Sequence, residues 1–192
     1  MADLTQRAAT DVSPVCAVLT LGHSTRPIDE FFAMLVGHGV TVLVDVRTVP
    51  SSRHNPQSGD QALSERLAAE HMGYEQAAGL SGFRCTHPNS PNTGWRNLSF
   101  RGYADCMQTA EIAQELIDLI ALAQDERVAL MCAEAVPWHC HRSLIADALI
   151  AHGVWACEIV SPAKLHPHKL TPFARVFTEA PGSRIDYPLE QP

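Results

Sequence analysis

The stretch "ALMCAEAVPWHCHRSLIADALIAHG", residues 129–153, is the part of the sequence that most directly indicates the fold. Its first four residues belong to an apolar run that extends from residue 127 to Cys132. This run has the length of a strand. A short loop follows, and residues 140–152 then place apolar side chains at helical spacing before Gly153. The stretch therefore predicts a buried strand, a loop and a helix.

The same alternation of apolar runs and helical patterns extends over most of the chain. Further strands are expected at 15–21, 41–46 and 154–160 and near Tyr74, and further helices around residues 28–37, at 61–72 and at 104–124. Strands that alternate with helices imply right-handed crossovers and a parallel sheet covered on both faces. The predicted fold class is therefore α/β, a three-layer sandwich with a mainly parallel central sheet.

The length of 192 residues, of which 46% are hydrophobic, suits one domain with a substantial core. We expect a loose leader at 1–14, a single α/β domain at 15–160, and a Pro-rich tail at 161–192 that packs on the domain. Residues 74–102 are rich in Gly, Pro, Asn and Ser and predict a long loop. Its aromatic residues favour an ordered lid, formed by residues 80–102, over a disordered segment.

Charge and cysteine content restrict the classes of protein to consider. A net charge of −7 argues against an extended nucleic-acid surface, and no apolar run approaches the ~20 residues that span a bilayer. The first residues lack the apolar segment of a signal peptide, so we predict a cytoplasmic protein without a membrane partner. In that compartment the cysteines should be mostly reduced, and their spacing indicates neither a disulfide framework nor a zinc ribbon.

Ligands of parallel sheets bind beyond the carboxyl ends of the strands. Three groups of polar residues follow strands in this sequence: Gly22, His23 and Ser24; Asp45 and Arg47; and the segment 132–142. Because these strand ends should share one edge of the sheet, we expect the three groups to meet around one cavity. His23, at a strand end, is a functional candidate. Asp45 could orient His23 or Arg47, and Ser24 could contact a ligand or only cap a helix.

Cys132 and Cys140 are the candidate nucleophiles. Loop N–H groups and the positive end of a helix stabilise a thiolate and lower its pKa from about 8.5. Cys132 ends a strand before such a loop, whereas Cys140 lies closer to the helix start. His141 and Glu134 are candidate acids or bases, and Arg142, in the first helical turn, is expected to bind an anion beside the sulfur. The structural alternative for Cys132 is a small buried hydrophobic residue.

Metal binding is a competing use of the same segment, because Cys132, Glu134, His139, Cys140 and His141 are all competent ligands. Their spacing is poor, since His139 and His141 would not share a helix face. A redox pair of Cys132 and Cys140 is a further alternative. The leading interpretation uses no metal and no cofactor.

Four stretches, "LGHSTRPIDEFFAML", "LVDVRTVPSSRHNP", "GWRNLSFRGYADCM" and "ALMCAEAVPWHCHRSLIADAL", resemble a bacterial family known as domain of unknown function 488. The resemblance covers about residues 17–160 and implies the fold and the site residues but no reaction. The strand end "LVDVR" also resembles rhodanese-like domains. Cys132 and Arg142, however, lie further apart than the cysteine and arginine of the tight anion-binding loop in those domains. The positions that match the family pattern are Gly22, His23, Ser24, Asp45, Arg47, Pro50, Ser52, Tyr103, Ala104, Cys132, Ala133, Glu134, Cys140, His141 and Arg142.

These residues indicate an enzyme that acts on a small anionic substrate containing sulfur or phosphate. Cys132 or Cys140 would supply the thiolate, and Arg47 and Arg142 would bind the anion. The other residues assigned to the substrate site are Gly22, Ser24, Asp45, Ser52 and Tyr103. One alternative is a non-catalytic module that binds a nucleotide or a nucleic-acid phosphate, and another is a metal-dependent enzyme built on the Cys/His cluster. The aromatic residues of the tail could serve a homodimer.

Overall fold

The structure, a computed structural model, describes residues 16–48, 60–82, 86–136, 139–179 and 182–189. Its centre is a six-stranded sheet with the order β3-β2-β4-β1-β5-β6. The first five strands in the chain are parallel, and β6 pairs antiparallel with β5 at one edge. They are β1 (Val18–Gly22), β2 (Val42–Asp45), β3 (Gly73–Gln76), β4 (Val128–Cys132), β5 (Ala156–Ser161) and β6 (Lys164–Pro167).

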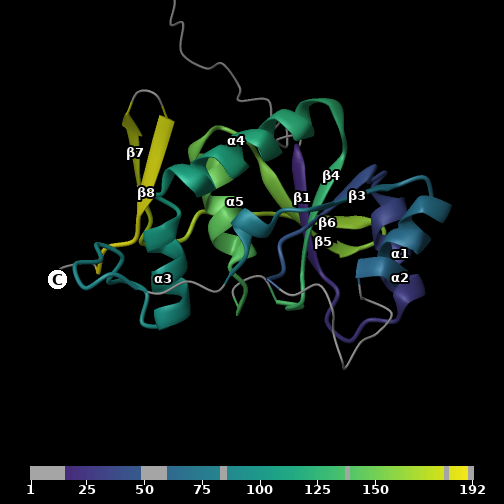
Figure 1. Cartoon of the computed structure of the whole chain (residues 1–192), viewed down its shortest axis with the longest axis horizontal. Helices are drawn as coiled ribbons and strands as arrows, with labels where there is room; N and C mark the ends of the chain where they lie inside the picture. Colours follow the sequence, from purple (N-terminus) through teal and green to yellow (C-terminus); the bar gives the residue numbers. More distant parts are fainter. Residues whose placement is uncertain (1–15, 49–59, 83–85, 137–138, 180–181, 190–192) are drawn as a thin grey trace, which may run out of the picture.

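Helices cover both faces of this sheet, which confirms the predicted three-layer α/β class (Figure 1). On one face lie α1 (Ile28–Gly37) and α2 (Asp60–Ala69). On the other lie α3 (Leu98–Cys106), α4 (Ala110–Asp125) and α5 (Arg142–Ala151). Every residue of β1, β2 and β4 is buried, because both faces of these central strands pack against helices.

Local signals in the sequence locate several element ends correctly. The spacing of Phe31, Phe32 and Leu35 places these side chains against the sheet in α1, and the helix ends at Gly37 as predicted. Gly39 follows with a φ of 65°, and Gly153 after α5 has a φ of 78°. Both are left-handed conformations that glycine adopts at little cost.

The predicted helix at 104–124 is two helices, because the chain breaks between α3 and α4. The Thr109 hydroxyl accepts a hydrogen bond from the Ile112 N–H and so caps a new helix. Asn97 caps α3 in the same way, accepting from the Ser99 and Phe100 N–H groups, so this helix begins inside the predicted loop. Gly73, predicted to close α2, instead opens β3.

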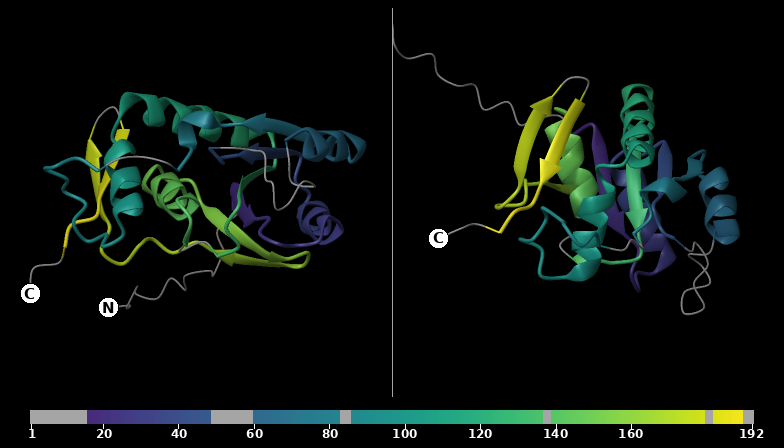
Figure 2. Two further views of the ribbon diagram at one scale, coloured as in Figure 1. Left: turned by 60° about the horizontal axis from the view of Figure 1, so that its bottom comes forward. Right: turned by 60° about the vertical axis from the view of Figure 1, so that its left-hand side comes forward.

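The C-terminal tail contains strands that the sequence does not predict. Besides β6, it forms a hairpin of β7 (Arg175–Glu179) and β8 (Gly182–Asp186) that lies beside α5 and apart from the central sheet (Figure 2). The buried carboxylate of Asp147 on α5 anchors the tail to the domain. It accepts hydrogen bonds from His168 Nε2 (2.7 Å), from the Thr171 hydroxyl (2.6 Å) and N–H (3.1 Å), and from the Tyr187 hydroxyl (3.0 Å).

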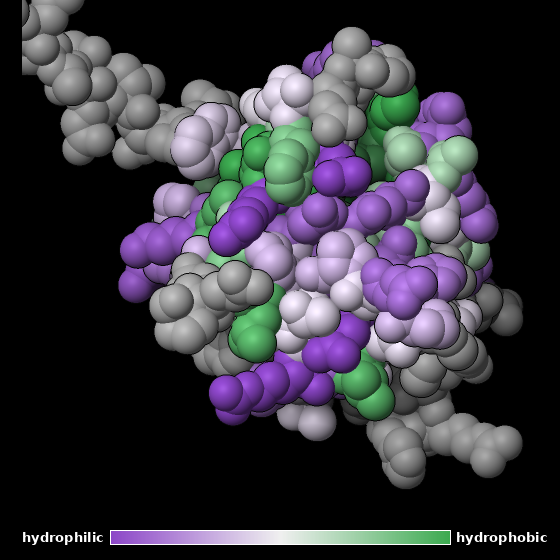
Figure 3. Space-filling view, turned by 90° about the vertical axis from the view of Figure 1, so that its left-hand side faces the viewer, coloured by the Kyte–Doolittle hydropathy of each residue, from purple (hydrophilic) through white to green (hydrophobic). Residues whose placement is uncertain are grey.

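The face that carries the hairpin is mainly hydrophilic, with hydrophobic residues in separate small groups (Figure 3). Val176 and Phe177 of β7 are exposed. A homodimer through these tail residues stays a prediction. In the part of the chain that the structure describes, every helix is too short or too polar to cross a membrane.

Cys16 and Cys157 form a disulfide, which the spacing of the cysteines in the sequence did not indicate. The two residues are 141 positions apart in sequence, but their Cα atoms lie 5.6 Å apart. The reason is the sheet order, because β1 and β5 are neighbours and pair Val18 with Ala156. The bond therefore joins the chain just before β1 to an adjacent strand.

The Asp147 anchor leads to a prediction for stability. Asp147→Ala leaves three side chains and one N–H group inside the protein without their acceptor, so we expect a loss of about 3 kcal/mol in the free energy of unfolding. Denaturant unfolding measures this loss. The control is Asp125→Ala at the exposed end of α4, which should change stability by less than about 0.5 kcal/mol. Equal effects of the two substitutions would contradict the anchoring role.

Candidate functional site

The site is organised by β4, which lies between β2 and β1 in the sheet. Cys132, its last residue, pairs with Gly22 of β1, and its neighbour Met131 pairs with Asp45 of β2. Backbone hydrogen bonds extend this pairing beyond the strands, from the His23 N–H to the Cys132 carbonyl (3.0 Å) and from the Ser24 N–H to the Ala133 carbonyl (2.9 Å). Three strand ends thus converge around Cys132.

A cavity of about 480 Å³ opens at this edge. Five of the residues proposed from the sequence line it, namely Arg47, Cys132, Glu134, Cys140 and His141, and their roles stay predictions. The predicted lid also contributes, because Gly82 and three residues at the start of α3 border the same cavity. The further lining residues are Thr48, Gly82, Asn97, Ser99, Phe100, Ala133 and His139.

The sulfur of Cys132 is held by hydrogen-bond donors. The Cys140 thiol donates to it, and this bond is the main reason that the pKa of Cys132 falls to about 7. Burial opposes the decrease, while the N–H groups of Glu134 and Ala133 and the charge of Arg142 add to it. The same sulfur–sulfur bond, together with burial, raises the pKa of Cys140 well above its ordinary value. These opposite shifts make Cys132 the more acidic of the two thiols.

His141, the residue just before α5, has a fixed orientation beside these two thiols. Its Nε2 donates to the Val46 carbonyl (3.2 Å), which leaves Nδ1 to face the Cys140 sulfur at 3.8 Å. The Tyr103 ring packs against the imidazole with centroids 4.9 Å apart. The Tyr103 hydroxyl donates to the Leu80 carbonyl (3.0 Å), so Tyr103 contacts His141 rather than the cavity predicted for it.

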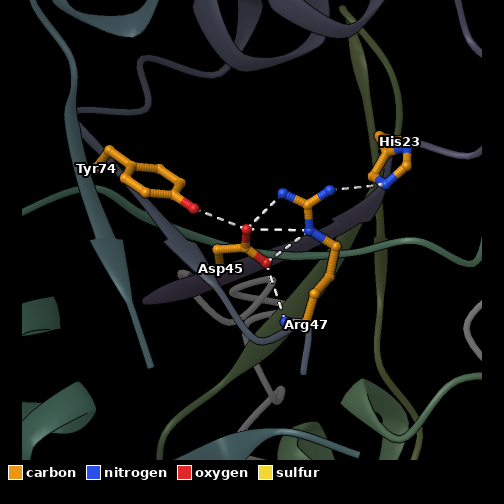
Figure 4. A network of polar contacts seen from close by, with 4 residues as sticks. All are labelled: His23, Asp45, Arg47 and Tyr74. Carbon is orange, nitrogen blue, oxygen red and sulfur yellow. Dashed lines mark hydrogen bonds and ion pairs between the residues drawn. The ribbon is translucent and has the colours of Figure 1, made fainter. Parts of the chain in front are cut away.

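Arg47 belongs to a buried polar network at the end of β2 (Figure 4). The Asp45 carboxylate accepts from Arg47 Nε and Nη2 (2.6–3.0 Å) and from the Tyr74 hydroxyl (2.8 Å). Burial lowers the pKa of Arg47, but the bonds and charge of Asp45 outweigh it and raise the pKa. Burial and the same carboxylate raise the pKa of Tyr74. Asp45 therefore holds Arg47 at the cavity wall as a cation.

His23 lies behind Arg47 and does not border the cavity. Its Nδ1 donates to the Ser24 carbonyl (3.0 Å), and its Nε2 accepts from Arg47 Nη1 at 3.3 Å. Burial is the main cause that lowers the pKa of His23, so the ring is neutral. This geometry favours a role in orienting Arg47 over direct proton transfer to a ligand.

Arg142 differs most from its predicted role as an anion ligand. Its side chain is fully buried and lies outside this cavity. The guanidinium donates from Nη1 to the Glu134 carbonyl and from Nη2 to the Ala135 carbonyl, and Glu158 lies 3.5 Å from Nη2. Arg142 is therefore a positioning residue, because it holds the loop whose N–H groups reach the Cys132 sulfur.

Gly22 makes this arrangement possible. A Cβ atom at residue 22 would lie 1.8 Å from the Glu134 carbonyl oxygen and 2.9 Å from Arg142 Nη1.

Ser24 and Asp45, which were also predicted to contact the anion, do not line the cavity. Ser24 forms a turn with a φ of 45°, and Ser52 lies outside the described residues.

Sequence reasoning missed Tyr74 as part of the site, and it placed the start of α3 in the lid without singling out Asn97. Tyr74 lies on edge strand β3, whose register beside β2 sets its hydroxyl against Asp45, and no spacing rule encodes that pairing. Asn97 was detectable, because an Asn immediately before an amphipathic segment is a helix-capping signal. Gly82 lies against the His141 ring, where a Cβ would come within 2.5 Å of Nδ1.

Cys132, Cys140 and His141 could also hold a metal ion. One donor atom from each residue lies within 4.8 Å of the other two. Among the described residues, Glu134 and His139 border the same cavity but are not part of this close group.

In the comparison with known families, the model of the domain of unknown function DUF488 matches residues 27–149. The chain belongs to the DUF488 family. The resemblance proposed from the motifs is therefore correct. No curated protein and no solved structure matches the chain, and nothing in these comparisons supports a relationship with rhodaneses.

The thiol pair of this DUF488 protein predicts a distinct pH dependence of alkylation. With a chelator present, the rate at Cys132 should reach half its maximum near pH 7, because the lowered pKa leaves much thiolate at neutral pH. Cys140→Ala should move this midpoint upward, since the Cys140 hydrogen bond is the main cause of the shift. Peptide mapping by mass spectrometry measures the rate. The control is the denatured protein, where thiols titrate near pH 8.5, and a native midpoint equal to this control would refute the assignment.

Gly22→Ala should destabilise the DUF488 fold by about 3 kcal/mol, because the new Cβ forces the loop and Arg142 apart. Gly73→Ala is the matched control at another strand, where the atom nearest to the Cβ would be a Val42 methyl at 3.2 Å. We expect a change within about 1 kcal/mol there. Thermal or denaturant unfolding compares the two. A Gly22→Ala protein as stable as the control would show that the loop is not held as described.

Proposed function

We propose that this DUF488 protein is an enzyme that acts on a small anionic substrate containing sulfur or phosphate, with Cys132 as the nucleophile. The observation that carries the proposal is the position of the Cys132 sulfur. It lies at the wall of a cavity and accepts hydrogen bonds from the Cys140 thiol and from two N–H groups of the loop. A sulfur held by three donors and open to a cavity has the surroundings of a reactive thiolate.

The size and lining of the cavity support a small ligand. A volume of about 480 Å³ lies within the range of ~300–1,000 Å³ typical of small-molecule sites. The Arg47 guanidinium supplies a positive charge at the wall, and Asn97, Ser99 and Thr48 add polar groups. Phe100 supplies an apolar surface, as expected for a pocket that also limits access of water.

The chemistry begins with attack of the Cys132 thiolate on an electrophilic atom of the substrate. With a sulfane sulfur donor such as thiosulfate, a sulfur–sulfur bond to Cys132 forms and the sulfur–sulfur bond of thiosulfate breaks. Sulfite leaves with the electron pair, and Cys132 becomes a persulfide. With a phosphate ester, a sulfur–phosphorus bond forms, the ester oxygen leaves with its electron pair, and solvent protonates that oxygen. Arg47 stabilises the anionic substrate in either case.

The proposal also covers the binding partner of the enzyme and its location in the cell. The partner is a small anionic ligand or nucleotide rather than an extended nucleic acid, because the chain is acidic. We place the enzyme in the cytoplasm, and Cys132 and Cys140 are both in the free thiol form that the proposed chemistry needs.

Covalent trapping tests the proposed reaction. Incubation with thiosulfate or with an aryl phosphate, followed by intact-mass analysis and peptide mapping, should show one sulfur or phosphoryl adduct on Cys132. Cys132→Ser should abolish it, because a serine hydroxyl is not ionised near neutral pH. The matched control is Cys106→Ser at the end of α3, outside the cavity, which should retain the adduct in full.

Two results would oppose the enzyme proposal. One is an adduct of equal yield in the Cys132→Ser and wild-type proteins. The other is nucleotide binding, measured by calorimetry, that is unchanged in Cys132→Ala while no probe forms an adduct. The second result would favour a binding module without chemistry.

A further inference from the structure

The three side chains nearest to the proposed reaction centre have the geometry of a metal site. The sulfurs of Cys132 and Cys140 and a ring nitrogen of His141 lie within 4.8 Å of one another, and Cys140 Sγ is 3.8 Å from His141 Nδ1. A tetrahedral Zn²⁺ with bonds of about 2.3 Å to sulfur and 2.0–2.1 Å to nitrogen holds two sulfurs about 3.8 Å apart. It holds a sulfur and a nitrogen about 3.5 Å apart. The three donors need only small movements to meet these distances.

The orientation of His141 is the one that a ligating histidine requires. Metal-bound imidazoles usually donate their other N–H to a carbonyl or carboxylate, which fixes the ring and its tautomer. His141 Nε2 donates to the Val46 carbonyl at 3.2 Å, so the lone pair is on Nδ1, the atom that faces Cys140. The Tyr103 ring, held by its hydroxyl bond to the Leu80 carbonyl, supports the imidazole from one side.

The donor set and its surroundings indicate which ion would bind. Two thiolates and an imidazole select a soft or borderline cation such as Zn²⁺ over Mg²⁺ or Ca²⁺, which prefer oxygen ligands. The three donors border the 480 Å³ cavity, so a fourth coordination position would face its interior. Three protein ligands with an open fourth position differ from the closed, four-ligand structural zinc sites.

We propose that Cys132 Sγ, Cys140 Sγ and His141 Nδ1 bind one Zn²⁺ ion and that the ion competes with the electrophilic substrate for the Cys132 sulfur. The competition rests on the proposed function, whereas the binding of the ion does not. Binding displaces the thiol protons, and the Cys132 electron pair that would attack a substrate then forms the bond to zinc. The zinc-bound protein is the dormant form, and removal of the ion restores the nucleophile.

Two measurements on the whole 192-residue chain test the inference. Titration with Zn²⁺ against a competing chelator, with elemental analysis after dialysis, should give one tightly bound ion per chain. Saturation with Zn²⁺ should slow alkylation of Cys132 at least tenfold, and excess chelator should reverse this. Co²⁺ in place of Zn²⁺ should give the visible absorption bands of a tetrahedral thiolate site, which reports the ligand set without any variant.

Variants separate the ligand role of His141 from a structural role. His141→Gln removes the imidazole ligand but keeps a polar side chain, and it should weaken Zn²⁺ binding roughly tenfold or more. His152→Gln, at the other end of α5, is the matched control and should leave the affinity unchanged. Equal affinities of the two variants would overturn the assignment.

The outcomes distinguish this inference from the function on which part of it rests. Absence of a stoichiometric ion, or Zn²⁺ binding that leaves Cys132 alkylation unchanged, would overturn the metal site while the thiolate enzyme remains supported. A bound ion together with a Cys132 that stays unreactive after chelation would support the metal site and overturn the thiolate enzyme.

Discussion

The arrangement of the site depends on the buried guanidinium of Arg142. A single side chain from the first turn of α5 crosses beneath the loop after β4 and holds the carbonyl groups of Glu134 and Ala135. With their carbonyls fixed on one side, the loop residues direct N–H groups toward the Cys132 sulfur. The close approach requires Gly22, and the positive charge near the sulfur favours the thiolate. Strand, loop, helix and nucleophile are thus coupled through one cation.

The sequence was sufficient to predict the central sheet and the convergence of its strand ends. Continuous apolar runs identify β1, β2 and β4 because strands covered on both faces need apolar residues throughout. The rule that ligands bind at the carboxyl ends of parallel strands then brings Arg47 and Cys132 together before any coordinates are known. Burial restricts the composition of central parallel strands, and the sheet fixes the position of the residues that follow them. Both can therefore be predicted from a single sequence.

Other features depend on contacts that no local pattern encodes. The contacts of Arg142 could not be predicted, because helix-start arginines can face either a ligand or the preceding loop, and only the path of residues 133–135 decides between them. The hairpin β7–β8 escaped prediction because its anchor, Asp147, lies on a helix some thirty residues earlier in the chain. The disulfide between Cys16 and Cys157 depends on strand order rather than on cysteine spacing. In each case the decisive partner is distant in sequence.

The two proposed uses of the Cys132, Cys140 and His141 group have a common physical basis. The factors that stabilise a thiolate, namely a donor thiol, directed N–H groups and a nearby cation, also prepare a sulfur to bind a metal ion. The fixed imidazole of His141 adds a third donor atom for a metal ion. The same electron pair on Cys132 can therefore serve an electrophile or a cation, one at a time.

The insertion of β4 between β1 and β2 has a consequence for how the molecule is made. While a ribosome has synthesised only the first hundred residues, β1 and β2 have no common neighbour, and each presents an unpaired edge of apolar strand. Closing that gap requires a segment about eighty residues after β2, which is a contact of high sequence separation and therefore slow to form. The nascent chain is thus most exposed to aggregation, and most in need of a chaperone, until the strand that carries Cys132 emerges.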